Sequence, residues 1–293
     1  MTINSFVDQA GFRLAYTRQR SGPVVLLIQG VGVHGDGWLP QVEALGGQFT
    51  CITFDNRGLG QSGPAVGPIS VEQIADDARA VLDAEKIDAC HVVGHSLGGT
   101  VAIPLALQAR ERVRSLALLC TFADGRDAAP LTPRMMWMGM RSRIGTRAMR
   151  RRGFAGLIFP PGRAVNADFP RLAALFGHDL ADTPKVVGLQ FKAMRRAALS
   201  GRLGELDELP MVVASAVHDP IARRCLGKSW RRGSRGRGMW NFLMRRMVCR
   251  LRMRAKPMRC CWSICWGASD SRQGDLEFNS IVRQRKARVP RSR

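Results

Sequence analysis

The segment with the clearest chemical meaning is a tight turn with a serine at its centre. Gly94, His95, Ser96, Leu97 and Gly98 form a G-x-S-x-G pattern, directly after a strand-like apolar run and directly before a helix-like one. Such a turn holds the serine in a strained backbone conformation with its hydroxyl exposed, and it leaves room only for glycine two residues to either side. A serine presented in this way can attack a carbonyl carbon. The pattern therefore predicts that Ser96 is the nucleophile of an acyl-transfer reaction.

The elements around this turn alternate between strand-like and helix-like runs. The expected strands are short and apolar, and they cover residues 3–8, 11–18, 23–29, 51–54, 89–94, 115–120 and 211–216. The expected helices between them cover residues 38–45, 71–87 and 97–109. Strands that alternate with helices predict an α/β fold, with a mostly parallel sheet flanked by helices.

One interval interrupts this alternation. Residues 122–207 contain helix-like runs, such as 132–152 and 185–199, but no strand-like run. An insertion at this place would lie over the carboxyl ends of the strands, where the sites of α/β sheets form. We therefore expect a core made of residues 1–121 and 208–222, with residues 122–207 as a helical cap. We interpret the many methionines and arginines of the cap as its surface and apolar lining, not as a cofactor or nucleic-acid site: Met135, Met136, Met138, Met140, Arg150, Arg151 and Arg152.

Three further segments, together with the serine turn, resemble the α/β-hydrolase superfamily. Gln29-Gly30-Val31 is similar to the family's oxyanion loop, although glutamine stands where the family usually has histidine. Residues 55–62, Asp-Asn-Arg-Gly-Leu-Gly-Gln-Ser, are similar to its D-x-R-G-x-G-x-S turn, in a form most similar to carboxylesterases and enol-lactonases. Asp219 follows a strand-like run, at the place where the family has its catalytic acid. The resemblance covers residues 1–222 and implies the α/β-hydrolase fold.

The resemblance also implies a role for each of these residues. Ser96 would be the nucleophile, and the backbone N–H groups of Val31 and Leu97 would stabilise the developing oxyanion. Asp219 would orient the base, with Asp124, just after the preceding strand, as the alternative acid. The implied enzyme hydrolyses a small carboxylic ester or lactone and needs no cofactor and no metal.

The histidine that should complete the triad is missing from its expected place. In this fold the chain order is serine, acid, histidine, and no histidine follows Asp219. The five histidines of the chain are His34, His91, His95, His178 and His218. His34 in the oxyanion loop and His178 in the cap remain alternatives for the base. His91 is expected to be packed within a strand, His95 to point away from the site, and His218 to flank the acid. Without this base the chain would be an impaired enzyme with residual activity.

The composition changes abruptly near residue 222. Residues 1–222 contain 24 Lys and Arg against 20 Asp and Glu, whereas residues 223–293 contain 21 against 3. Five of the eight cysteines and four of the six tryptophans also lie in this tail. One interpretation is a non-catalytic basic protein whose tail binds nucleic acid or anionic membrane. A metal site at Cys260, Cys261 and Cys265 is a weaker interpretation, because the spacing is not a zinc pattern and no histidine accompanies it.

We favour a third interpretation, a frameshift, in which the tail is translated out of frame. In the shifted frame, each new codon begins at the third base of an original codon. Met239-Trp240 then gives Val, Trp240-Asn241 gives Glu, and Met247-Val248 gives Gly. The codons of Arg246-Met247 then allow histidine, 27 residues after Asp219. This order resembles the strand and loop that carry the family's catalytic histidine. One frame change between Asp219 and Lys228 would explain the missing histidine and the basic tail together, so nucleic acid is not an expected partner.

No targeting or membrane segment is expected. The chain has no apolar run of 18 or more residues that would span a membrane. Its first residues, Met1 to Asn4, lack the charged and apolar regions of a secretory signal. We therefore expect a cytoplasmic protein whose partner is a small-molecule substrate.

Overall fold

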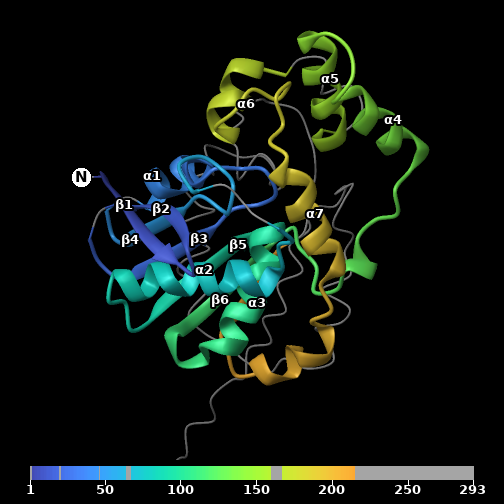
Figure 1. Cartoon of the computed structure of the whole chain (residues 1–293). Helices are drawn as coiled ribbons and strands as arrows, with labels where there is room; N and C mark the ends of the chain where they lie inside the picture. The colour runs from blue at the N-terminus through green and yellow to red at the C-terminus, as the bar shows by residue number, and fades with distance from the viewer. Residues whose placement is uncertain (1, 20, 46, 64–66, 160–166, 215–293) are drawn as a thin grey trace, which may run out of the picture.

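A computed structural model of the chain describes residues 2–19, 21–45, 47–63, 67–159 and 167–214 (Figure 1). The basic tail predicted at 223–293 lies outside the described residues, and so do His218, Asp219 and the end of the core segment predicted at 208–222. The described residues form one sheet with helices on both faces and a group of helices that projects from it.

Seven strands form one sheet in the described part of the chain. They are β1 (Thr2–Gln9), β2 (Phe12–Gln19), β3 (Val24–Ile28), β4 (Thr50–Phe54), β5 (Cys90–His95), β6 (Val113–Leu119) and β7 (Met211–Ala214). Their order across the sheet is β1-β2-β4-β3-β5-β6-β7. β2 pairs antiparallel with both β1 and β4, while the pairs from β4 to β7 are parallel. The prediction of an α/β fold with a mostly parallel sheet is confirmed.

The central strands are apolar on both faces because helices cover both sides of the sheet. In β3, Leu26 and Ile28 pack into one core, whereas Val25 and Leu27 pack into the other. The helices that flank the sheet are η1 (Gly35–Trp38), α1 (Leu39–Leu45), α2 (Val71–Ala84), α3 (Leu97–Gln108) and η2 (Arg110–Arg112). Helices α2 and α3 pack side by side and contribute to the first core, and α1 contributes to the second (Figure 1).

The segment between β6 and β7 is helical, and Figure 1 shows α4, α5 and α6 grouped at one end of the molecule. Its elements are η3 (Gly125–Asp127), α4 (Pro133–Arg141), α5 (Arg147–Ile158), α6 (Phe169–Phe176), α7 (Val186–Arg196) and η5 (Ser200–Leu206). The helix-like run predicted over 132–152 is helical, but it is divided between α4 and α5. Gly145 adopts φ +103°, which interrupts a helix, and the hydroxyl of Thr146 caps α5 by accepting from the N–H of Met149. Across the described ranges, no helix combines the length and apolar character needed to cross a membrane.

Candidate active site

Ser96 lies on a sharp turn between β5 and α3. Its backbone has φ +52° and ψ −117°, a conformation that residues other than glycine rarely adopt. Its N–H donates to the carbonyl oxygen of Leu119 at 2.9 Å, and the hydroxyl of Thr121 donates to the carbonyl oxygen of Ser96 at 2.7 Å. Ser96 is half-buried, whereas His95 and Leu97 are buried. The turn is therefore fixed by β6 and its flank in the strained form that the motif requires.

The glycines on either side of Ser96 are required by close backbone contacts. A Cβ on Gly94 would lie 2.3 Å from the carbonyl oxygen of Gly98. A Cβ on Gly98 would lie 2.0 Å from the carbonyl oxygen of Ile28, at the end of β3. Because both obstacles are backbone atoms, a side chain at either position would have to displace the turn itself.

The glycine-rich loop after β3 passes directly beside Ser96. A Cβ on Gly30 would lie 3.3 Å from the Cβ of Ser96. The side-chain amide of Asn56 donates to the carbonyl oxygen of Gln29 at 3.2 Å, which fixes the start of the loop. Glycine at position 30 therefore lets the loop approach the serine closely enough for both to contact one ligand.

Two glutamine side chains occupy alternate N–H groups of this loop. The side-chain oxygen of Gln29 accepts from the N–H of Gly30 at 3.0 Å. The side-chain oxygen of Gln190, from α7, accepts from the N–H of Gly32 at 2.9 Å. The N–H of Val31 lies between these two donors, and it has no acceptor among the residues that the structure describes. As far as the described residues are concerned, that N–H is therefore free to donate to a ligand.

The N–H of Leu97 is a second available donor for a general reason. Leu97 is the first residue of α3, and the first N–H groups of a helix have no carbonyl partner within it. The same groups form the positive end of the helix dipole, which favours negative charge nearby. Negative charge that develops beside Ser96 therefore meets a helix N-terminus.

The turn at residues 55–62 supports the loop after β3 from the other side. The carboxylate of Asp55 accepts from the N–H groups of Gly35 at 2.9 Å and Gln61 at 3.1 Å. Arg57 donates two hydrogen bonds to Asp77, at 2.5 and 2.6 Å, and the Asp77 side chain is fully buried. Burial raises the pKa of Asp77, while the hydrogen bonds from Arg57 oppose that rise. The buried ion pair anchors the turn to α2.

Two of the five histidines are packed into the core beneath the nucleophile turn. His95 is 3% exposed, and its ring lies edge-on to that of Trp38. Burial lowers the pKa of His95 to about 4. His91 is buried in β5 and hydrogen-bonds to the hydroxyl of Ser115, and burial also lowers its pKa. His91 is a packed residue, as expected, and the ring of His95 is likewise buried, against Trp38. Neither is placed to act as a base at neutral pH.

The two histidines that remained alternatives for the base have other contacts. The ring nitrogens of His178 lie 2.9 Å from the carbonyl oxygen of Asp179 and 3.1 Å from that of Gly32. The ring of His34 lies with its centroid 6.2 Å from that of His178, and burial lowers the pKa of His34. Within the described part of the chain, neither ring forms a hydrogen bond with Ser96.

The alternative acid, Asp124, is engaged by other groups. One carboxylate oxygen accepts from the N–H of Ser200 at 2.8 Å, and the other accepts from its hydroxyl at 2.6 Å and from Arg126 at 2.8 Å. Burial alone would raise the pKa of Asp124, but these hydrogen bonds lower it below its ordinary value. Since both oxygens are occupied, the geometry gives no support to Asp124 as the group that orients a histidine. Asp219 lies outside the described residues and stays a prediction.

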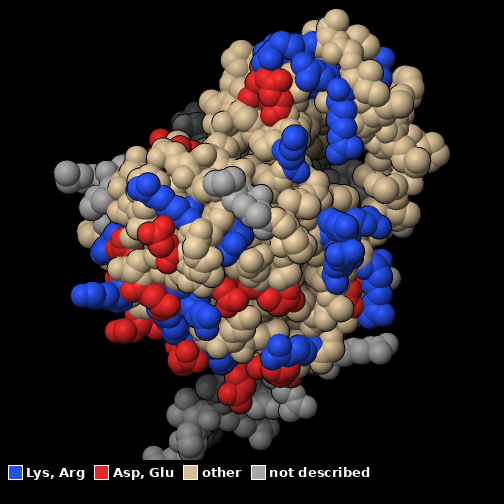
Figure 2. Space-filling model, in the orientation of Figure 1, with Lys and Arg blue, Asp and Glu red and all other residues tan. Residues whose placement is uncertain are grey.

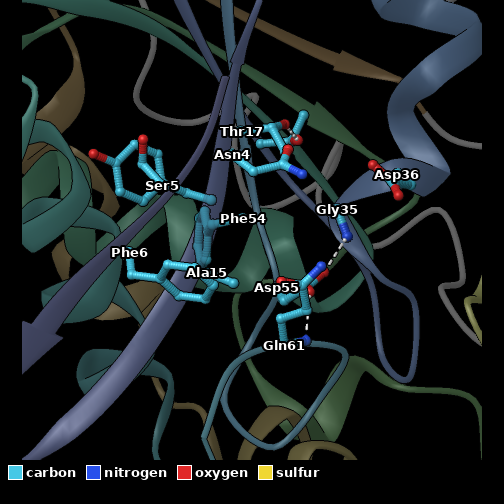
Figure 3. A pocket seen from close by; sticks show the side chains of 12 residues that line it. Asn4, Ser5, Phe6, Ala15, Thr17, Gly35, Asp36, Phe54, Asp55 and Gln61 are labelled. Carbon is cyan, nitrogen blue, oxygen red and sulfur yellow. Dashed lines mark hydrogen bonds between the residues drawn. The ribbon is translucent and has the colours of Figure 1, made fainter. Parts of the chain in front are cut away.

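A small cavity lies away from the nucleophile turn, between the β1-β2 hairpin and the loop at Gly35 (Figure 3). Its volume is about 60 Å³, and its lining includes Asp55 and Gln61 but not Ser96. Pockets for small ligands usually have roughly 300–1,000 Å³, so this cavity does not hold an ester substrate. Within the described ranges, no three His, Cys, Asp or Glu side chains come close enough together to hold a metal ion.

The fold and the serine turn together define the class of protein. The family model described as the α/β hydrolase fold matches residues 23–220, which is more than half of the chain. The chain belongs to the α/β-hydrolase fold family, and the family expected from the sequence is confirmed.

Individual relatives are similar in sequence to parts of this chain. A RutD protein of Azorhizobium caulinodans, whose name assigns it as a carbamate hydrolase, is 42% identical over 106 residues, which are 36% of this chain and 40% of that protein. A RutD protein of Agrobacterium fabrum is 29% identical over 200 residues, 66% of this chain and 74% of that one. The match to the first relative therefore spans less than half of its length.

Solved structures share the fold over more of the chain. A hydrolase from Pseudomonas aeruginosa superposes with a TM-score of 0.65 and 26% identity, over 80% of this chain and 89% of that one. The enol-lactonase from Burkholderia xenovorans superposes with a TM-score of 0.63 and 23% identity, over 79% and 90%. This second likeness concerns the fold alone.

Proposed function

We propose that this protein is a serine hydrolase that acts on small carboxylic esters or lactones, with Ser96 as its nucleophile. The observation that carries the proposal is the strained turn, which presents a half-buried serine beside Gly30 and at the N-terminus of α3. Strain of this kind persists only where the surrounding structure enforces it, and it is common at catalytic residues.

In the proposed reaction the hydroxyl of Ser96 attacks the carbonyl carbon of the substrate, and the carbonyl oxygen gains negative charge. The N–H groups of Val31 and Leu97 stabilise that oxyanion, and loss of one such donor costs about 3–4 kcal/mol of transition-state stabilisation. A base oriented by Asp219 accepts the proton of the hydroxyl and returns it to the leaving alcohol. Water then releases the acyl group and regenerates Ser96.

Two features support a small carbonyl substrate. The RutD relatives are named as carbamate hydrolases, and a carbamate shares with an ester a carbonyl carbon bound to a heteroatom. The helical segment over 122–207 contacts the loop after β3 through Gln190 and His178, and these contacts support its proposed role as a cap over the substrate. We propose residues 1–121 and 208–222 as the hydrolase core beneath it.

We also propose that the activity of this exact chain is impaired. No candidate histidine in the described part of the chain forms a hydrogen bond with Ser96, and no histidine follows Asp219 in the sequence. Serine hydrolases that lose one triad member still accelerate the reaction roughly 10³–10⁴-fold over the rate in water. The expected activity is therefore low but still dependent on Ser96.

The test is hydrolysis of p-nitrophenyl acetate by the full chain and its Ser96→Ala variant, with Ser5→Ala on β1 as the matched control. We expect a rate barely above background that Ser96→Ala removes and Ser5→Ala retains. A fluorophosphonate probe, followed by mass spectrometry, should label the peptide that contains Ser96 slowly.

Two outcomes would change the proposal. A rate within about tenfold of an ordinary esterase (kcat about 10 s⁻¹), lost in Ser96→Ala, would show that a histidine of this chain is the base, and His34→Ala and His178→Ala would identify it. No turnover and no labelling, together with tight and salt-sensitive binding to DNA, would support the non-catalytic basic protein instead.

A further inference from the structure

The outer face of α4 and the segments beside it carry an exposed group of large apolar side chains. Seven large hydrophobic side chains are exposed in the described part of the chain, and five of them lie within residues 131–144. These five are 45–64% exposed: Leu131, Met136, Trp137, Met140 and Ile144. We call them the α4 patch. Their grouping within one short segment matters because apolar residues scattered singly over a surface are ordinary, whereas exposed apolar side chains that gather together often mark an interaction site.

The α4 patch is distinct from the face by which α4 packs on its neighbour. On the packed side, a Cβ added to Gly156 of α5 would lie 2.7 Å from the sulfur of Met138. A Cβ added to Gly153 would lie 2.6 Å from the backbone of Arg141. Glycines in α5 thus let the two helices approach closely through Met138, while Met136 and Met140 remain exposed. The packing of the fold therefore leaves the α4 patch without a partner among the described residues.

The segment that carries the α4 patch contains charge of one sign only. Residues 131–152 contain seven arginines and no aspartate or glutamate. Arg147, Arg150 and Arg151 form ion pairs with Asp179 and Asp182. The remaining arginines of the segment have no acidic partner within the described ranges: Arg134, Arg141, Arg143 and Arg152. Figure 2 shows basic side chains gathered over the projecting helices, next to an uncharged edge at the position of α4.

Charge decides between the possible occupants of this surface. A second copy docked through the same patch would place arginines against arginines, because a twofold contact uses the same surface on both partners. The tail of this chain is also basic, with 21 Lys and Arg against 3 Asp and Glu. Nucleic acid would complement the charge but would leave the apolar side chains unused. An anionic lipid surface complements both, since apolar side chains with tryptophan enter the interface while arginines contact the headgroups.

We propose that α4 and its flanks attach this protein peripherally to anionic lipid surfaces. The side chains of Met136, Trp137 and Met140 enter the interface between headgroups and acyl chains, and Arg134 and Arg143 lie at the headgroups. The guanidinium carbon of Arg141 lies 5.8 Å from the ring centre of Trp137, so the charge and the aromatic ring reach the interface together. The attachment does not depend on Ser96 or on hydrolysis.

The test uses the full chain with vesicles of phosphatidylcholine alone and of phosphatidylcholine mixed with phosphatidylglycerol. The variant replaces Met136, Trp137 and Met140 by glutamine, which removes apolar side chains and leaves every charge, including those of the tail, unchanged. The matched control replaces Phe6 and Leu39 by glutamine, because these are the other large apolar side chains that are exposed in the part of the chain that the structure describes. Binding is measured by co-sedimentation at low and at high salt.

We expect the original chain and the control to bind the mixed vesicles, and the patch variant to bind about tenfold more weakly or less, most clearly at high salt where the tail is screened. Brominated acyl chains should quench part of the tryptophan fluorescence, and the conservative Trp137→Phe should remove that part while binding persists. Equal binding by variant and original chain, equal binding to both vesicle types, or quenching unchanged in Trp137→Phe would overturn the proposal. A dimer that the patch variant dissociates would show that a second copy is the occupant and would overturn it too.

Discussion

The side-chain oxygen of Gln190 in α7 accepts a hydrogen bond from the backbone N–H of Gly32 at 2.9 Å, across 158 residues of chain. The side-chain nitrogen of Gln190 donates to the carbonyl oxygen of Arg57 at 3.4 Å, and Gln190 is fully buried. One side chain therefore joins the helical segment to the loop after β3 and to the turn at 55–62, both of which support the surroundings of Ser96.

Gln190→Leu should lower the free energy of unfolding by about 1–3 kcal/mol, because the N–H of Gly32 and the carbonyl of Arg57 lose a buried partner. Urea unfolding followed by tryptophan fluorescence measures this change. Gln108→Leu makes the same replacement at the exposed end of α3 and should change stability by less than about 0.5 kcal/mol. Equal effects of the two substitutions would show that the hydrogen bonds of Gln190 contribute nothing.

Gly98→Ala should destabilise the protein by about 3 kcal/mol or more, because the new Cβ meets the backbone of β3 and cannot be relieved by a rotamer change. Gly188 in α7 provides the control, since a Cβ there meets nothing within 4 Å. Gly188→Ala should stabilise the protein by about 0.5–1 kcal/mol through the better helix propensity of alanine. Thermal unfolding of both variants measures these two changes in stability. A Gly98→Ala protein as stable as the original would show that the backbone at Gly98 is not tightly packed against β3.

Strand β3 and the nucleophile turn could be predicted because their signals are local. Residues 24–28 are apolar without interruption and lie between Pro23 and Gly30, and the turn carries its glycines at fixed spacing. The break between α4 and α5 also had a local signal that the prediction missed, since Gly145 followed by Thr146 is a helix end followed by an N-cap.

The contribution of Gln190 could not be predicted in the same way. Its position on a helix is visible in the sequence, but its partner Gly32 lies on another element, and no sequence spacing marks the pair. Likewise, the packing of His95 against Trp38 and the hydrogen bonds of Asp124 to Ser200 depend on how the chain closes in space. Such long-range contacts determine which titratable groups remain available for chemistry.

The stability of the protein should depend on pH through His95. Its folded pKa is about 4, below the ordinary value of 6.5, because burial disfavours the charged ring. The unfolded chain therefore binds more protons between these values, so the stabilising contribution is complete above about pH 6.5 and is lost as the pH falls to about 4, a difference of about 3 kcal/mol. His95→Met should reduce this loss. His34 and His91 are shifted in the same direction and stay in both proteins, so the comparison of unfolding free energies near pH 7 and near pH 4 isolates His95. Identical pH dependence in both proteins would contradict this assignment.

The described sheet ends at β7, which pairs with β6 on one side. If the tail is translated out of frame, the sequence that should follow is absent, and with it the histidine expected 27 residues after Asp219. Resequencing the gene across the codons for Asp219 to Lys228 tests this hypothesis first, because an inserted or deleted base must lie there.

Restoring the other frame near Asp219 should then change activity and stability together. A histidine able to accept the proton of Ser96 should raise kcat for p-nitrophenyl acetate by several orders of magnitude, since loss of the triad histidine lowers the kcat of a serine protease about 10⁶-fold. A further strand beside β7 should raise the melting temperature, because it pairs N–H and C=O groups at the sheet edge. Ser96→Ala in the repaired chain is the control and should abolish the gain in rate but not the gain in melting temperature. A stop codon, no histidine in the new frame, or an unchanged kcat would refute the frameshift, and residues 223–293 would then need a function of their own.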